Sequence, residues 1–159
     1  MGAFFMFLFY ILLQVIVAWF YGHVLEYFLH KIMHDYKRFP FLFKHHFSVH
    51  HRISRQNEMR DESYDKIFEK SSLFELGGLS ILLLTHLPVV FFLPFFYITI
   101  VGCMCQYYWI HRKSHINVEW GAKKLPWHYN HHLGKNQDAN WGVTTDWVDS
   151  LLNTRIKYF

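Results

Sequence analysis

Charged residues and cysteines are both scarce in this chain of 159 residues. Only 18% of the residues are charged, whereas about 25% is usual for a soluble domain. The two cysteines, Cys103 and Cys105, stand two positions apart inside an apolar run, too close for an ordinary disulfide framework. We expect both to be small packing residues in a buried helix. Repeats, low-complexity tracts and Gly/Ser linkers are also lacking, so residues 1–159 are expected to form a single domain.

Apolar and aromatic residues dominate instead. The chain is 52% hydrophobic and 21% aromatic, and its formal net charge is +4. A basic balance suits either nucleic acid or the anionic face of a membrane. Because the apolar residues are concentrated in long runs, the sequence favours the membrane, and no nucleic-acid partner is expected.

The first apolar run covers residues 3–21 and holds no charge and a single polar amide, Gln14. As a helix it would be about 29 Å long, close to the thickness of the hydrocarbon layer. A cleaved signal peptide would carry a basic segment before its apolar core. No Lys or Arg precedes Lys31, so the run is interpreted as a retained membrane helix.

The second apolar run, residues 76–110, is too long for one crossing and slightly short for two. Pro88 and Pro94 are natural turning points, which favours a helical hairpin with a short first helix over one long tilted helix. Nine of the 16 Lys and Arg residues lie in 31–70 and seven in 111–159. Basic segments stay cytoplasmic, which requires an even number of crossings between them. We therefore predict about three spans, a cytoplasmic C-terminus and an N-terminus on the other side.

Ten of the 13 histidines fall into four short groups, "HKIMH", "HFSVHH", "HRKSH" and "HYNHH". Their members are His30, His34, His46, His50, His51, His111, His115, His128, His131 and His132. Each group contains a pair four residues apart, and such a pair shares one helix face. His51 and His131 point off that face, which suits either ligands of a second metal ion or a bridge between helix ends. Ten imidazoles are too many for one ion, because a metal takes four to six ligands, and about right for two.

All ten would lie on one face of the membrane if the hairpin crosses an even number of times. This argument is independent of the Lys and Arg count, and the two agree. The isolated His86 and His23 are expected to have structural roles, although His23 stands seven residues before His30 and could share its helix face.

The type of ligand limits which metal ions the site could bind. Imidazole suits zinc, copper, iron and nickel, whereas a closed structural zinc site uses four ligands. Two ions in a histidine-lined site beside lipid indicate oxygen chemistry on an apolar substrate. Iron is the usual metal for such chemistry, and the ligands alone leave zinc and copper open.

The order and spacing of the four groups resemble the fatty acid hydroxylase/sterol desaturase superfamily of membrane di-iron enzymes. The residues that follow "HYNHH" are similar to the ending of that family: Asn140, Trp141, Gly142, Trp147, Asp149, Leu151 and Thr154. The resemblance covers residues 20–154. Leu152 and Asn153 stand where the family often has Phe-Gly before the threonine, and members often have four or more spans.

The resemblance implies an all-α membrane protein whose ten grouped histidines hold two iron ions in a helical cap on the cytoplasmic face. It implies O2-dependent hydroxylation of a lipid C–H bond, with zinc able to occupy the site in a purified protein. Asn140, Asp149 and His45 are expected to orient the ligands. No haem-binding domain is fused, so we expect a separate electron donor, either cytochrome b5-like or a ferredoxin with its reductase. The membrane would be the endoplasmic reticulum of a eukaryote or the inner membrane of a bacterium.

Two other functions remain open. A membrane acyl-lipid desaturase also uses histidine groups and two irons, although typically three groups. A non-catalytic membrane metal-binding protein should carry its ligands inside the spans, and here only His86 lies within an apolar core. The basic segment 52–70 is either a solvated loop or a docking face for an acidic donor. Fatty acyl chains, ceramides, sterols, carotenoids and ether lipids all suit such a site.

Overall fold

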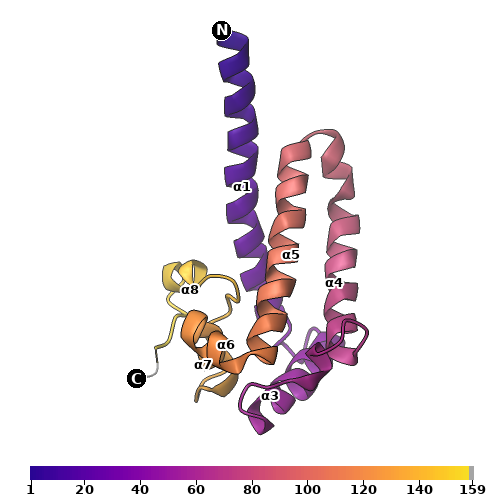
Figure 1. The fold of residues 1–159 in the computed structure, drawn as a ribbon, viewed down its shortest axis with the longest axis vertical. Coiled ribbons are helices and arrows are strands. Elements are labelled where there is room, and N and C mark those ends of the chain that lie inside the picture. Colours follow the sequence, from indigo (N-terminus) through magenta and orange to yellow (C-terminus); the bar gives the residue numbers. More distant parts are fainter. Residues whose placement is uncertain (158–159) are drawn as a thin grey trace.

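The computed structural model describes residues 1–157, and within them it contains helices and no strand, so the predicted all-α class is confirmed. Figure 1 shows three long helices, α1, α4 and α5, rising from a group of short elements at one end. In chain order the elements are α1 (Gly2–Ile32), α2 (Pro40–His45), the π-helix η1 (His46–His51), α3 (Arg52–Gln56), the 3₁₀ helix η2 (Glu62–Tyr64), α4 (Lys70–His86), the 3₁₀ helix η3 (Leu87–Phe91), α5 (Pro94–Ile116), α6 (Val118–Lys124), α7 (Pro126–Leu133) and α8 (Trp147–Leu151).

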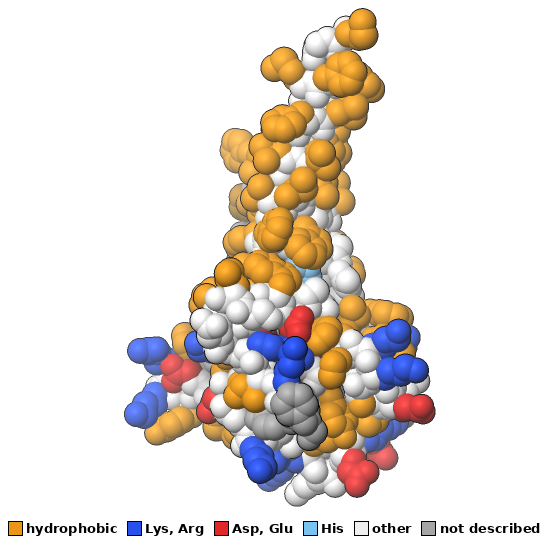
Figure 2. Space-filling model, turned by 90° about the vertical axis from the view of Figure 1, so that its left-hand side faces the viewer, with side chains coloured by type: hydrophobic (Ala, Val, Ile, Leu, Met, Phe, Trp, Pro, Cys, Tyr) orange, Lys and Arg blue, Asp and Glu red, His pale blue; other side chains and the backbone are white. Residues whose placement is uncertain are grey.

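The long helices form an apolar stalk, and the short elements form a charged cap. Large hydrophobic side chains of α1 face outward, with Phe4 and Phe5 each 62% exposed. Figure 2 shows hydrophobic side chains along the stalk and Lys, Arg, Asp and Glu gathered on the cap. A helix that is apolar on all sides suits a lipid surrounding. Gly2–Ile32 and Lys70–Phe91 are both long and apolar enough to cross a membrane.

The predicted hairpin is present, and the single tilted helix is wrong. The chain turns through η3, which holds Pro88 near its start, and Pro94 begins α5. Proline suits the first turn of a helix because the N–H that it lacks has no partner there anyway. The last turns of α5 carry polar residues, and α5 is not among the two helices apolar enough to cross. A third crossing therefore stays a prediction.

Helix α1 packs along α5 through small and apolar side chains. Ala18, Ile100 and Met104 form a buried cluster between the two helices. A Cβ at Gly22 would lie 3.0 Å from the Cys103 sulfur, so glycine permits the close approach. Cys103 is thus a packing residue as expected, whereas Cys105 is exposed.

The tail of the chain returns to the cap end of α1. Tyr27 of α1 packs in one cluster with Trp141 and Val148. The Glu26 carboxylate accepts hydrogen bonds from the backbone N–H groups of Val143 (2.5 Å) and Thr144 (2.8 Å). These contacts hold residues 141–148 against α1 and place them beside the histidines of the cap.

Candidate metal centre

All ten grouped histidines meet inside the cap. Nine of them are buried, and the tenth, His34, is intermediate as a residue but has a side chain that is only 3% exposed. Nine of them form two sets, and within each set one nitrogen per residue lies within 4.8 Å of the others. The five-histidine cluster consists of His30, His34, His46, His51 and His131. The four-histidine cluster consists of His50, His111, His115 and His132.

His128 borders the four-histidine cluster. Its Nε2 lies 3.3 Å from the Nε2 of His115, and its ring centre lies 4.7 Å from that of His132. The two clusters adjoin each other, because the ring centres of His51 and His132 are 4.2 Å apart. The ten histidines thus form one continuous centre with two lobes.

Backbone geometry decides which cluster each histidine joins. "HFSVHH" folds as the π-helix η1, whose hydrogen bonds run from residue i to i+5. His46 and His51 therefore face the same cluster, while His50 faces the other. The predicted pairing of His46 with His50 on one face is wrong for this reason. The pairs 30/34 and 111/115 lie in regular α-helix or its last turn, and each stays within one cluster.

Seven of the histidines use Nδ1 to contact an oxygen outside the clusters. The contacts are His30 to Trp141 O (2.6 Å), His34 to Asp138 (3.3 Å), His50 to Asp61 (2.9 Å), His51 to Gln137 (2.8 Å), His111 to Glu75 (3.0 Å), His115 to Met59 O (2.8 Å) and His131 to Ala139 O (2.7 Å). Because every partner is an acceptor, each Nδ1 carries the proton and donates. The Nε2 atoms are left with free lone pairs, the arrangement typical of metal-ligating histidine.

These lone pairs point at one another. The Nε2 of His51 lies 3.1 Å from those of both His46 and His131, and His30 and His46 are 2.9 Å apart at Nε2. Because His51 and His131 both carry their proton on Nδ1, their Nε2 atoms cannot hydrogen-bond each other, so a cation is the natural partner. Nitrogens bound about 2.1 Å from one ion at 90–109° are about 3.0–3.4 Å apart. The buried Nε2 atoms of His50, His111 and His132 have no hydrogen-bond partner. Both clusters therefore fit metal ions.

Burial keeps these imidazoles neutral, which is the form that binds metal. Loss of solvation lowers the pKa of His46, His51 and His132 well below the ordinary value of 6.5, and neighbouring histidines lower it further. The pKa of His34 falls to about 2 for the same reasons. At neutral pH the centre offers ligands and does not repel a cation.

The predicted orienting residues have different surroundings. Asp149 accepts hydrogen bonds from Trp141 N (2.8 Å) and Gly142 N (2.7 Å), and the Trp141 carbonyl in turn accepts from His30. Asp149 therefore contacts a candidate ligand, His30, only through Trp141. Asn140 adopts a left-handed backbone (φ 59°) and bonds Ile156 rather than a histidine. Glycine is required at 142, where a Cβ would meet the Thr145 carbonyl oxygen.

His45 does not take the orienting position expected of it. Its ring stacks on Phe74 with ring centres 4.5 Å apart, and it lines a cavity. Within residues 1–157 no hydrogen bond joins it to a clustered histidine. The isolated histidines lie outside both clusters: His23 contacts Thr144 (3.0 Å), and His86 contacts Leu82 O (2.7 Å).

Four partners of the histidines were missed from the sequence: Asp61, Glu75, Gln137 and Asp138. Asp61 lies in the segment 52–70, whose interpretation as a solvated loop is wrong where Ser54, Met59, Asp61 and Tyr64 are buried. Glu75 precedes the second apolar run by one residue. A carboxylate entering an apolar helix is costly unless it has a partner, and that cost was the available signal.

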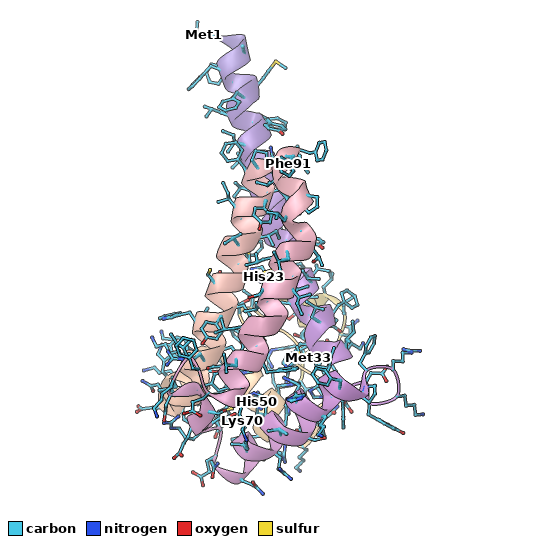
Figure 3. The ribbon with its side chains drawn as sticks, turned by 90° about the vertical axis from the view of Figure 1, so that its right-hand side faces the viewer. Met1, His23, Met33, His50, Lys70 and Phe91 are labelled. Atoms are coloured by element: carbon cyan, nitrogen blue, oxygen red, sulfur yellow. The ribbon has the colours of Figure 1, made fainter. Side chains whose placement is uncertain are left out.

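A cavity of about 930 Å³ leads from the centre into the stalk. His46, His50 and His111 line its cap end, and Leu79, Leu82 and Ile100 line the part between the long helices. Its walls come mainly from α4, with residues of α1 and α5 completing them, and Gly77 and Gly78 leave room in α4. Figure 3 shows His50 near Lys70 at the cap end of α4, with Phe91 at the far end of the hairpin. An apolar chain in the cavity would reach the histidines.

Comparison with known protein families gives one match. The model described as fatty acid hydroxylase matches residues 15–154, which include both histidine clusters and the tail that supports them. No curated protein and no solved structure matches the chain.

Proposed function

This chain belongs to the fatty acid hydroxylase family, within the fatty acid hydroxylase/sterol desaturase superfamily, and we propose that it is an O2-dependent lipid hydroxylase with two iron ions. The family consists of hydroxylase- and desaturase-type oxygenases. The observation that carries the proposal is the junction of two histidine clusters with an apolar cavity. A lipid chain and a metal centre would meet at that junction.

The five-histidine cluster would hold one ion, and the four-histidine cluster together with His128 would hold the other. Bound iron supplies the activation of O2 and the oxidation of an unactivated C–H bond. Zinc can occupy the same imidazole ligands in a purified protein. The carbonyl and carboxylate acceptors around the centre fix the ring orientations before any metal arrives.

The cavity would bind and orient the substrate. Leu79, Leu82 and Ile100 would hold the apolar chain and exclude water, with the reacting carbon at the end lined by His46 and His50. Hydroxylation inserts one atom of O2 into the C–H bond and reduces the other to water, which consumes two electrons and two protons. We propose that a separate donor, cytochrome b5-like or a ferredoxin with its reductase, supplies the electrons.

The topology proposal is that α1, α4 and α5 all cross the membrane and that the cap and the C-terminus are cytoplasmic. Support comes from the Lys and Arg residues, which flank the apolar runs on the cap side. The membrane would be the endoplasmic reticulum or a bacterial inner membrane. A reporter fused to the C-terminus of the 159-residue chain should be active only in the cytoplasm.

The test of function is expression in a host with a defined lipid pool, followed by lipid mass spectrometry. A lipid heavier by one oxygen atom is expected with the wild-type chain and not with His132→Ala. A lipid that instead lost two hydrogens would identify a desaturase. An unchanged lipid pool beside a chain that retains metal would favour a non-catalytic metal-binding protein.

A further inference from the structure

The surroundings of the two histidine clusters differ in charge, and this difference has a consequence for metal binding. Two buried carboxylates contact the four-histidine cluster. Asp61 bonds His50 at 2.9 Å with its side chain 1% exposed, and Glu75 bonds His111 at 3.0 Å with its side chain 8% exposed. The third outward contact of this cluster is the Met59 carbonyl, which accepts from His115.

The five-histidine cluster is surrounded by neutral groups. The carbonyls of Trp141 and Ala139 and the amide of Gln137 accept from three of its members. The carboxylate in contact with it, Asp138, touches His34 at 3.3 Å but is 77% exposed. Glu26, one turn before His30, is instead bonded to the backbone of Val143 and Thr144.

The two clusters offer similar numbers of imidazole ligands, so ligand number does not compensate for the difference in nearby negative charge. With His128, whose Nε2 is 3.3 Å from that of His115, the four-histidine cluster also has five imidazoles within reach. A divalent cation in a buried site is stabilised by nearby negative charge, because the low local dielectric screens that charge weakly. A carboxylate that accepts from the far nitrogen of an imidazole also makes the ligating nitrogen more basic.

We propose that the two metal ions are held unequally: the ion at the four-histidine cluster binds first and most tightly, and Glu75 and Asp61 are the residues that set this order. The ion at the five-histidine cluster is the exchangeable one. Its edge also lies nearer the surface, since the Asp138 side chain that contacts His34 is 77% exposed. This inference rests on the proposed two-metal centre and concerns the order of metal binding, which activity alone does not report.

The experiment uses the full chain, purified in detergent and loaded with Zn²⁺, which undergoes no redox chemistry. The protein is equilibrated with a chelator at increasing concentration, and bound zinc per chain is measured by elemental mass spectrometry. We expect two separate losses of one ion each. Loss of both ions in a single step overturns the inference. A chain that binds no zinc overturns the metal centre itself, so the two failures are distinguishable.

Single substitutions identify which cluster releases its zinc ion in each of the two steps. His131→Ala should leave only the tightly held ion and His115→Ala only the loosely held one; the reverse result overturns the assignment. Glu75→Gln keeps an oxygen that can accept from His111 but removes the charge. It should weaken the tight site by about 10–100-fold and bring the two steps together. The matched control, Glu69→Gln, removes a partly exposed carboxylate that pairs with Lys66 at 3.7 Å and touches neither cluster, and it should leave both steps where they were.

Discussion

Asp149 offers the sharpest test of how the tail supports the centre. Its carboxylate is fully buried and accepts three hydrogen bonds, from Trp141 N (2.8 Å), Gly142 N (2.7 Å) and the Thr154 hydroxyl (2.7 Å). In Asp149→Ala all three donors lose their acceptor. A buried donor left unsatisfied costs about 1–3 kcal/mol, so the loss of all three bonds should cost at least roughly 3 kcal/mol of stability. For a chain of this size each kcal/mol shifts Tm by about 2–4 °C.

The expected result is a fall in Tm of at least roughly 6 °C, measured by circular dichroism on the purified protein, together with loss of bound metal. Metal is lost because Trp141, whose carbonyl orients His30 at 2.6 Å, is no longer held. The matched control is Asp146→Asn, which breaks a partly exposed ion pair with Arg155 (2.7 Å) and should cost at most about 1 kcal/mol. Equal Tm and metal content in Asp149→Ala and the wild type would refute the reasoning.

Three further outcomes are expected. Gly78→Leu should fill part of the cavity and lower kcat/KM for a long-chain lipid by about tenfold or more, with metal content unchanged. Gly102→Leu, on an exposed face of α5 outside the cavity, should leave kcat/KM unchanged. Equal effects of the two substitutions would contradict the substrate site. His132→Ala should lose the ion at the four-histidine cluster, whereas His86→Ala should keep both ions, as measured by elemental analysis of both proteins. The metal-free chain should lose stability as the pH falls from about 8 to about 5. The reason is that histidines of the unfolded chain take up protons near pH 6.5, whereas the folded-state pKa of His34 is about 2. A Tm independent of pH would contradict the buried, neutral centre.

The features that were predictable from the sequence are those set by short local patterns of residues. Pro88 and Pro94 marked the hairpin turn because a helix interior rejects proline. The ten histidines were identifiable because their spacing repeats at helical intervals next to apolar runs. Asp149 was identifiable from the family resemblance, although the contact that it supports is the one between Trp141 and His30 of the first histidine group.

The remaining features depend on contacts between distant segments or on a local departure from α-helical geometry. His50, His46 and His51 are divided between clusters by a π-helix, which the spacing of apolar residues does not reveal. Glu75 meets His111 across 36 residues of sequence, and no periodicity links the two. His45, beside a candidate ligand in sequence, faces the cavity because η1 rotates its neighbours toward the centre.

The return of the tail to α1 also orders events during synthesis of the chain. Glu26 meets Thr144 across 118 residues, and His30 meets Trp141 across 111. Chains emerge from the ribosome with the N-terminal part first, so α1 is made long before residues 141–148, which pack against it. His30, which needs the Trp141 carbonyl, is therefore unoriented until residue 141 has been translated. Until then the histidines of the cap are not assembled, so the proposed metal centre could be loaded only after that point.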